Sequence, residues 1–567
     1  MGRTVNPGND GFAKMLATKY VDKTGLIGEF DSTLDTTDCL VLSTRPRRFG
    51  KSYSALSLVA FYSCGCDSRG LFEGLVVSSR QGWDAHLNAY NVVQLDITGV
   101  IDGAKNKAER INEKARMDNT ANAANKVAWQ SLVVPTATEW IREGLCGIVP
   151  DAGVRAGSVD VTLTNAILDV VKATGRKFVF IIDEWDALYR IAEGDTESQE
   201  AYADWLRSIF KDMSFTPKAI AGAYMTGILP IKKHNHQSAV SDFNEFTMLD
   251  PGPYAPYVGF TEHEVLTLSR EGELNPEEMR LFYDGYTLRY VGWGEDGRRV
   301  AITVETYPPY PVMKAYKNGK VKSYWPSSEA FEGLRNYIDL NVDGLQKKIV
   351  RALGGLCVPV DPLGFGNDMV TLDSSDDVLT LLTHLGYLAY DEGPADGGTV
   401  RVPNEEVRRE LQRAVSKSRH PLLRQVMLDS IALLADVVAG HAKNVAAGIA
   451  AVHDRDCAPL FYNDEQALRA VVKTALVAAV DHYVRIEEMP GGRGLADIVY
   501  IPKPATAMPA LVVELKWDRP VDSAIDQIRE TRYCKPLEHV GVPVLLIGVT
   551  YDSKTKEHVC SIEEWVR

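Results

Sequence analysis

The sequence lacks the features of a membrane or secreted protein. No apolar run in its 567 residues approaches the ~20 residues that a membrane-spanning helix needs, and no secretory signal pattern opens the chain. The alanine-rich stretch 431–452 is interrupted by Asp436, His441 and Lys443, so we expect it to form one packed helix. These absences predict a cytoplasmic protein with no membrane partner.

Disulfide and zinc chemistry have equally little support. The eight cysteines are scattered, and Cys64 and Cys66 have no second pair at metal-ligand spacing, which predicts reduced thiols. The hydrophobic share of 45% and the charged share of 24% are those of an ordinary globular protein. The length allows about three or four domains.

A net positive charge is also missing. The formal charge of −14 argues against broad, non-specific coating of DNA, although phosphate binding depends on local cations. One basic cluster follows Pro403 on an expected helix, where a solvated helix face is the simpler explanation and a nucleic-acid contact is the alternative. Its members are Arg408, Arg409, Arg413, Lys417, Arg419 and Arg424.

A phosphate-binding pattern lies near the start of the chain. The apolar residues 40–43 predict a strand, which leads through a polar turn to Gly50-Lys51-Ser52 and into an apolar-periodic helix. Gly50 lets backbone amides approach a phosphate, Lys51 supplies a positive charge, and the Ser52 hydroxyl can hold Mg²⁺. The helix N-terminus adds its partial positive charge. This arrangement predicts a nucleotide-binding loop.

The loop departs from the GxxxxGK[ST] pattern at one position. Arg45 stands in place of the first glycine, and with Arg47 and Arg48 it is expected to make the loop unusually cationic. We take Arg48 as a nucleotide-binding candidate. A basic turn before a core helix is the structural alternative.

A second motif, FVFIIDEWD at 178–186, reads as a buried strand that ends in acids. Asp183 is expected to hold Mg²⁺ through water and Glu184 to orient the attacking water. A parallel strand that ends at an acidic helix cap gives a similar string for structural reasons. The strand–GKS–helix unit and the acidic strand together favour nucleotide hydrolysis.

Further segments suggest the architecture. The strand 219–226 ends at Thr226, which is either a sensor of the γ-phosphate or a simple strand-end hydroxyl. Strands and helices alternate up to about residue 250, which predicts a parallel sheet with helices on both faces. The segment 104–153 is expected to be a helical insertion, and prolines after 250 to open a mainly helical region. A helix and hairpin over 376–402 predict a winged-helix-like lid or spacer.

Near the C-terminus, the apolar strand ALVVELKW carries an acid and an amine on one face. Glu514 and Lys516 alternate with Val513 and Leu515, and Asp497 in the preceding strand is placed to meet Glu514 across a hairpin. Two carboxylates favour a hard divalent cation such as Mg²⁺, and a neighbouring lysine can polarise a water for attack on a phosphodiester. A surface strand with an incidental ion pair is the alternative.

The N-terminal half resembles an AAA-ATPase-like family. The matching segments are KYVDKTGLI, STRPRRFGKS, VVQLDIT, FIIDEWDAL and YMTGILPIKKHNHQSAVSDFNEFTML. The arginine at position 45 is shared by the RPRRFGK form of this family. The resemblance implies ATP as the ligand, with residues 20–23 beside the base or serving as an N-terminal cap.

The C-terminal region resembles the PD-(D/E)xK nuclease superfamily. The resemblance rests on YNDEQAL, GRGLADIVYIP, PALVVELKW, AIDQIRETRY and TKEHVCSIEEW. It implies that Asp497 and Glu514 are metal ligands for Mg²⁺ or Mn²⁺, that Lys516 is catalytic, and that Glu465 is an additional helical acid. Gln527 matches a conserved QxxxxxY element together with Tyr533, whose spacing also suits ordinary helix packing.

Together these features predict an α/β protein of four segments. They are an AAA-type P-loop core with a parallel sheet (1–250), a helical and winged-helix-like lid (251–405), a helical connector (406–455) and a PD-(D/E)xK nuclease-like α/β domain (456–567). The preferred interpretation is an ATPase whose ATP state controls metal-dependent DNA cleavage. Its candidate partners besides DNA are a second copy of the chain (a homo-oligomer) and a regulatory protein. The alternatives are a defence or signalling ATPase with a partner-triggered nuclease, and a non-catalytic nucleic-acid-binding ATPase.

Overall fold

The computed structural model describes most of the chain in two compact units. The described residues are 4–118, 126–150, 162–231, 242–294, 296–324, 337–339, 342–366, 372–393, 397–416, 421–456, 464–491, 494–503, 508–535, 537 and 541–565. Unit 1 comprises Met1–Tyr324 and Asp361–Gly398, and unit 2 comprises Trp325–Val360 and Thr399–Arg567. The chain therefore crosses between the units three times. The division of the chain into four domains stays a prediction.

A five-stranded parallel sheet forms the centre of unit 1, as the sequence predicts. Its order is β2-β3-β4-β1-β5, and every neighbouring pair is parallel. The strands are β2 (Asn91–Asp96), β3 (Phe178–Asp183), β4 (Ile220–Gly227), β1 (Leu40–Thr44) and β5 (Asn244–Phe246). β1, β3 and β4 are almost wholly buried, which explains their continuous apolar sequences.

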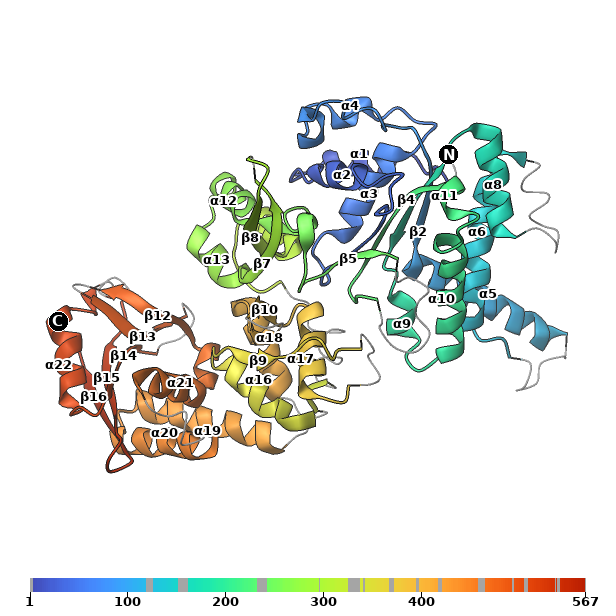
Figure 1. Cartoon of the computed structure of the whole chain (residues 1–567). Helices are drawn as coiled ribbons and strands as arrows, with labels where there is room; N and C mark the ends of the chain where they lie inside the picture. The colour runs from blue at the N-terminus through green and yellow to red at the C-terminus, as the bar shows by residue number, and fades with distance from the viewer. Residues whose placement is uncertain are drawn as a thin grey trace. The chain divides into compact units, whose positions relative to one another are not determined.

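Helices cover both faces of this sheet (Figure 1). On one face pack α1 (Asp10–Leu16), α2 (Gly25–Asp31) and α3 (Lys51–Tyr62), and on the other α5 (Ile97–Met117), α6 (Val133–Ile148), α8 (Leu163–Thr174) and α10 (Thr196–Phe210). The segment 104–153 is helical in its described part, as expected: α5 begins directly after β2, and α6 buries Ile141 and Leu145 in a core shared with α5, α8 and α10, while its status as an insertion stays a prediction. The polar residues that suggested an insertion occupy the outer faces of these helices.

The region after Pro251 contains the expected helices and also a sheet that the sequence did not suggest. A three-stranded antiparallel sheet of order β6-β8-β7 combines with three helices there. The elements are β6 (Phe260–Thr261), α12 (Glu262–Glu271), α13 (Pro276–Tyr283), β7 (Tyr286–Trp293), β8 (Arg299–Tyr307) and α14 (Pro309–Asn318). The expected helix and hairpin near 376–402 are confirmed as α17 (Ser375–His384), β10 (Ala389–Glu392) and β11 (Gly398–Arg401).

Unit 2 contains a second five-stranded sheet of order β12-β13-β14-β15-β16, in which only β14 and β15 pair in parallel. The strands are β12 (Tyr483–Gly491), β13 (Gly494–Pro502), β14 (Ala510–Trp517), β15 (Val544–Asp552) and β16 (Glu557–Glu564). Its helices are α16 (Leu345–Leu353), α18 (Glu405–Ser416), α19 (Pro421–Val438), α20 (Ala442–Asp456), α21 (Glu465–Ala475) and α22 (Asp522–Thr531).

The two faces of this sheet have separate cores. Val513 and Leu515 of β14 pack with α19, α20 and α21, whereas Ala510 and Val512 pack with α22, and Figure 1 shows these helices on opposite sides. The stretch 431–452 is not one helix, because a turn at Gly440, whose φ is 76°, separates α19 from α20. No helix in the described ranges is long and apolar enough to cross a bilayer.

Candidate functional site

The phosphate-binding loop, the acidic strand and Thr226 meet at one edge of the parallel sheet. Thr44 pairs with Gly227, and Ile182 with Met225, so β1, β3 and β4 end side by side. The carboxyl edge of a parallel sheet is where ligands bind in α/β proteins. Gly50 precedes α3 with a φ of 87°, a left-handed conformation that glycine adopts without strain.

Lys51 is buried at the start of α3, with its side chain only 4% exposed. Its Nζ donates to the carbonyl oxygens of Arg45 and Pro46, each at 3.0 Å, and lies 3.8 Å from Oε1 of Glu184. Burial lowers the pKa of Lys51, against the raising effect of the Glu184 carboxylate. The ammonium group therefore stands between the loop and the acidic strand.

The two acids of the β3 strand have different surroundings. One carboxylate oxygen of Asp183 accepts hydrogen bonds from the fully buried Thr226 hydroxyl and from the Glu184 amide, the latter at 3.1 Å. Glu184 follows with a φ of 54°, a left-handed conformation that is costly for a residue with a side chain. Ser52 lies at the exposed start of α3. The predicted nucleotide residues are therefore brought to one edge of the sheet.

Sequence reasoning missed Arg190, which organises this acidic turn. It donates to Glu184, and its Nε lies 3.0 Å from Oδ2 of Asp186, whose side chain is 1% exposed. The same Asp186 oxygen accepts the amides of Ile228 and Leu229 at 3.2 and 3.0 Å. Arg190 thereby fixes the Glu184 side chain to the end of β4. The spacing of Asp186 and Arg190, four residues apart in DEWDALYR, was the available signal.

The loop arginines do not act together as predicted. Arg45 is fully buried and donates to the carbonyl oxygens of Thr44, Phe246 and Thr247, so it joins the ends of β1 and β5 instead of facing a phosphate. Burial lowers the pKa of Arg45 to about 10. Arg48 lines the pocket described next, with its guanidinium carbon 5.3 Å from the ring centre of Tyr310.

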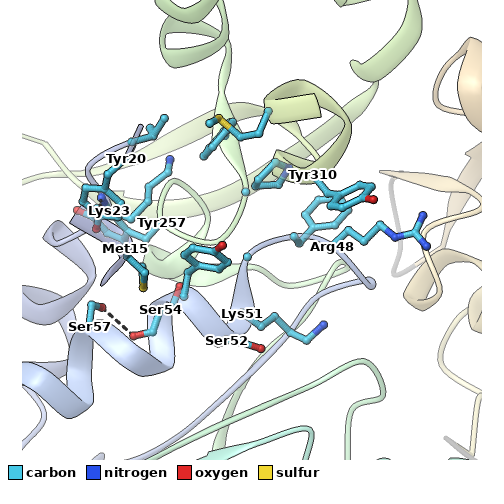
Figure 2. Close-up of a pocket in the computed structure, with 18 of the residues that line it drawn as sticks. Met15, Tyr20, Lys23, Arg48, Lys51, Ser52, Ser54, Ser57, Tyr257 and Tyr310 are labelled. Carbon is cyan, nitrogen blue, oxygen red and sulfur yellow. Dashed lines mark hydrogen bonds between the residues drawn. The ribbon is translucent and has the colours of Figure 1, made fainter. Parts of the chain in front are cut away.

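A pocket of about 410 Å³ opens beside the loop (Figure 2). In the figure Tyr20, Lys23 and Tyr257 gather on one side, Tyr310 lies on the other, and Lys51 lies at the start of α3. The walls carry one carboxylate, Glu184, among the described lining residues, and six cations, which are Lys19, Lys23, Arg48, Lys51, Lys314 and Lys317. The combination of aromatic and cationic side chains in one pocket suits a nucleotide.

Helix α14 supplies one wall of this pocket, which the sequence did not suggest. Tyr310, Lys314 and Lys317 all come from this helix, and Lys314 lies 5.6 Å from the ring centre of Tyr310. The prediction that residues 20–23 border a base agrees with the presence of Tyr20 and Lys23 in the wall. Lys23 is also held by Glu264 at 2.5 Å, so it serves the structure as well.

In unit 2, β13 and β14 bring Asp497, Glu514 and Lys516 together. Oδ2 of Asp497 accepts the Leu515 amide at 2.8 Å, which places this carboxylate between Glu514 and Lys516. Lys516 Nζ donates to Oε1 of Glu514 and to the carbonyl oxygen of Leu515, both at 2.9 Å. All three side chains are buried. Asp497 and Glu514 directly adjoin the paired residues Ile498 and Val513, so the two carboxylates come from neighbouring positions of the two strands.

Electrostatics at this site favour an added positive charge. Burial first, and then the neighbouring Asp497 carboxylate, raise the pKa of Glu514 to about 7, although Lys516 acts in the opposite direction. Oε2 of Glu514 is buried without a hydrogen-bond partner among the described residues. Two carboxylates and an unpartnered buried oxygen fit a hard divalent cation in donor type. The described residues contain no group of three His, Cys, Asp or Glu side chains arranged to hold a metal.

Other predicted residues lie around this site in different roles. Glu465 is the first residue of α21, half-buried, and its role as a third metal ligand stays a prediction. Gln527 donates to the Tyr533 hydroxyl at 3.1 Å, so the two members of the QxxxxxY element contact each other. The catalytic role of Gln527 also stays a prediction.

The basic cluster after Pro403 is largely engaged inside unit 2. Arg408 is half-buried and donates to the Leu353 carbonyl oxygen at 2.6 Å, and desolvation lowers its pKa to about 10. Arg409 pairs with Glu405, and Arg413 with Glu410. Lys417 and Arg419 lie outside the described residues, and Arg424 is exposed on α19. These pairings leave little of the cluster for a phosphate backbone.

Comparison with known proteins finds a family match for the first part of the chain. Residues 8–236 match the AAA-ATPase-like family, described as a predicted AAA-ATPase. The match includes the loop, the acidic strand and Thr226, and it supports an ATPase assignment for this segment. The nuclease-like region lies outside the match. A search among curated proteins found no match.

Two solved structures from Aeropyrum pernix show a distant likeness. The ORC1 protein in complex with DNA is 10% identical, with a TM-score of 0.24, over 75% of this chain and 100% of that chain. The ORC2 protein, in ADPNP–ADP complexes, is 12% identical, with a TM-score of 0.25, over 72% of this chain and 94% of its own. At such low TM-scores, the likeness gives no information about the function of this chain.

Proposed function

We propose that unit 1 binds and hydrolyses ATP with Mg²⁺. The observation that supports this most directly is the meeting of Lys51, Asp183, Glu184 and Thr226 at the carboxyl edge of the sheet, beside a cation-lined pocket. An excess of lysine and arginine over carboxylate attracts a polyphosphate, and aromatic walls accept a base.

Each residue has a definite task in this proposal. Lys51 exchanges its two carbonyl partners for phosphate oxygens, while Gly50 exposes backbone amides to the same phosphate. Ser52 and Asp183 hold the Mg²⁺, which neutralises charge on the phosphates when bound. Thr226 orients Asp183 through its hydroxyl, and Glu184 orients the attacking water.

Substitution of Glu184 by Gln tests the assignment. Glu184→Gln keeps the size of the side chain and removes its charge, so we expect ATP binding to persist and kcat to fall about 100-fold or more. The matched control is Glu193→Gln, at an exposed position nine residues further on. Equal turnover by wild type and Glu184→Gln in a phosphate-release assay would remove the hydrolytic role of Glu184.

We propose a second activity, metal-dependent DNA cleavage, for the nuclease-like region. Its support is the buried group of Asp497, Glu514 and Lys516 with the unpartnered Oε2 of Glu514. Asp497 and Glu514 would hold the cation, which supplies an activated water when bound. Lys516 fixes Glu514 by donating to Oε1, and its charge faces a phosphodiester.

ATP controls cleavage in this proposal by favouring one arrangement of the chain over another, which requires different ATP affinities for the two arrangements. Labelled linear, circular and single-stranded DNA, incubated with the full chain, Mg²⁺ and with or without ATP, test the whole scheme. Asp497→Asn should abolish cleavage, whereas Asp526→Asn, at an exposed position on α22, should not. If Asp497→Asn still cleaves DNA, the cleavage comes from another site. If the cleavage rate is the same with and without ATP, the proposed control by ATP is refuted.

A further inference from the structure

The nuclease-like site contains a second cation that neither the motif nor the family match indicates. Arg469 lies on α21, one turn after Glu465, and its side chain is only 12% exposed. Its guanidinium donates to Oδ1 of Asp497 and, at 3.1 Å, to Oε1 of Glu488. Nε of Arg469 is buried with no partner among the described residues.

These contacts use every oxygen of Asp497. Oδ1 accepts Arg469, and Oδ2 accepts the Leu515 amide at 2.8 Å. Glu514 differs, because Lys516 takes Oε1 and leaves Oε2 buried and unpartnered. A cation that bridges the two carboxylates would therefore find Oε2 of Glu514 without a donor and each oxygen of Asp497 already accepting one hydrogen bond.

Arg469 also supplies the charge that such a cation would supply. Guanidinium stays ionised throughout the accessible pH range and binds carboxylates by directed hydrogen bonds. A metal ion on Oδ1 of Asp497 would lie beside this guanidinium, and because both are positive, each weakens the binding of the other to the carboxylate. Even with Arg469 and Lys516 present, the three carboxylates Asp497, Glu514 and Glu488 outnumber the cations at the site.

We propose that Arg469 is a built-in competitor for the divalent cation of this site. In the metal-free chain its charge neutralises Asp497 and opposes a metal ion there, and this opposition falls if the guanidinium leaves Oδ1 and turns toward Glu488, which lies on the more exposed side. The residue thereby sets the metal concentration at which the site is filled. This inference rests on the proposed metal site in the nuclease-like region.

Mn²⁺ binding to the full chain, measured by the electron paramagnetic resonance signal of the free ion without nucleotide, tests the competition. The Mn²⁺ binding attributed to this site is the part that is lost when Asp497 is replaced by Asn. We expect Arg469→Gln to tighten it about 10- to 100-fold, because the positive charge that opposes the metal ion is removed. Arg469→Lys, which keeps the charge without the planar fork, should lie in between.

The control is Arg529→Gln, which breaks another arginine–carboxylate pair, with Glu563, on the exposed surface. It should leave Mn²⁺ affinity unchanged. Asp497-dependent binding that is equal or weaker in Arg469→Gln overturns the competitor role alone. If neither wild type nor Arg469→Gln shows Asp497-dependent binding up to millimolar Mn²⁺, the metal site itself is refuted and the competitor role with it. Circular dichroism of Arg469→Lys checks that folding is retained.

Discussion

Replacement of Lys51 by Met gives the most quantitative test of the nucleotide pocket. Methionine nearly fills the space of the lysine side chain but has no charge, and Lys51 is buried with a lowered pKa in the nucleotide-free protein. Loss of this costly buried charge should leave the nucleotide-free protein at least as stable as wild type near neutral pH. The pKa shift gives the sign: the charged form is the one that folding disfavours, so the gain grows as pH falls.

The effect of ATP should be the reverse. At an ATP concentration about 100 times Kd, binding stabilises wild type by about 2.7 kcal/mol. The loss of charge-assisted hydrogen bonds from Lys51 to phosphate weakens affinity by up to ~100-fold. At the same ATP concentration Lys51→Met then gains only about 0.4 kcal/mol. For a unit of this size, these energies correspond to an ATP-induced rise in Tm of about 3–4 °C in wild type and ~0.5 °C in the variant.

Thermal unfolding followed by tryptophan fluorescence, with and without ATP and Mg²⁺, measures both quantities. Lys218→Met, at an exposed position on α11 (Thr216–Ala219), is the matched control and should keep the full ATP-induced shift. A Lys51→Met protein that keeps the wild-type shift would refute the reasoning, because the phosphates would then bind elsewhere.

Three further outcomes follow from the same contacts. Arg190→Gln leaves the buried Asp186 carboxylate without its cation, so the free energy of unfolding should fall by about 2–4 kcal/mol; an unchanged Tm in calorimetry would contradict this. Burial and Asp497 raise the pKa of Glu514 from 4.5 to about 7, so the stability of the wild type should decline as pH rises through that range. Glu514→Gln should therefore have a higher Tm than the wild type at pH 8 and lose this advantage near pH 4.5. Equal Tm values of the two proteins at pH 8 would count against the raised pKa. Lys516→Met should stop DNA cleavage on gels while ATP hydrolysis stays near wild type, and loss of both activities would indicate a folding defect instead.

The site residues that could be predicted from the sequence lie in short, contiguous sequence motifs. The segments around Gly50 and Asp183 combine a buried strand with polar residues at its end, and parallel pairing then brings the strand ends together. Asp497 and Glu514 are predictable for the same reason, because a hairpin places them at neighbouring positions of its two strands.

The site residues that were not predicted lie outside those motifs and reach the sites through tertiary contacts. Lys314 reaches the pocket from α14, more than 250 positions after Lys51, and no local pattern marks it. Arg469 is one of several polar residues on an amphipathic helix, and only the tertiary structure places it on Asp497. Arg45 was misjudged because a charge in a phosphate-binding loop suggests a ligand, whereas carbonyl groups at the ends of two strands also need donors.

The hairpin of β7 and β8 was missed for another reason. Its strands are only partly buried, so apolar and polar residues do not alternate cleanly, and the prolines after 250 suggested short helices. Backbone pairing over Tyr286–Trp293 decides the structure there, and such pairing is not visible in one strand read alone.

The three crossings of the chain between its two units have a practical consequence for genetic dissection. A chain that ends after Gly398 keeps unit 1 whole but also carries 325–360 of unit 2, and a fragment that begins at Trp325 keeps unit 2 whole together with 361–398 of unit 1. No single stop codon or start site therefore yields either unit free of a segment of the other. A fragment of one unit would carry an unpaired segment of its neighbour, and point substitutions are the cleaner means to separate the roles of the two units.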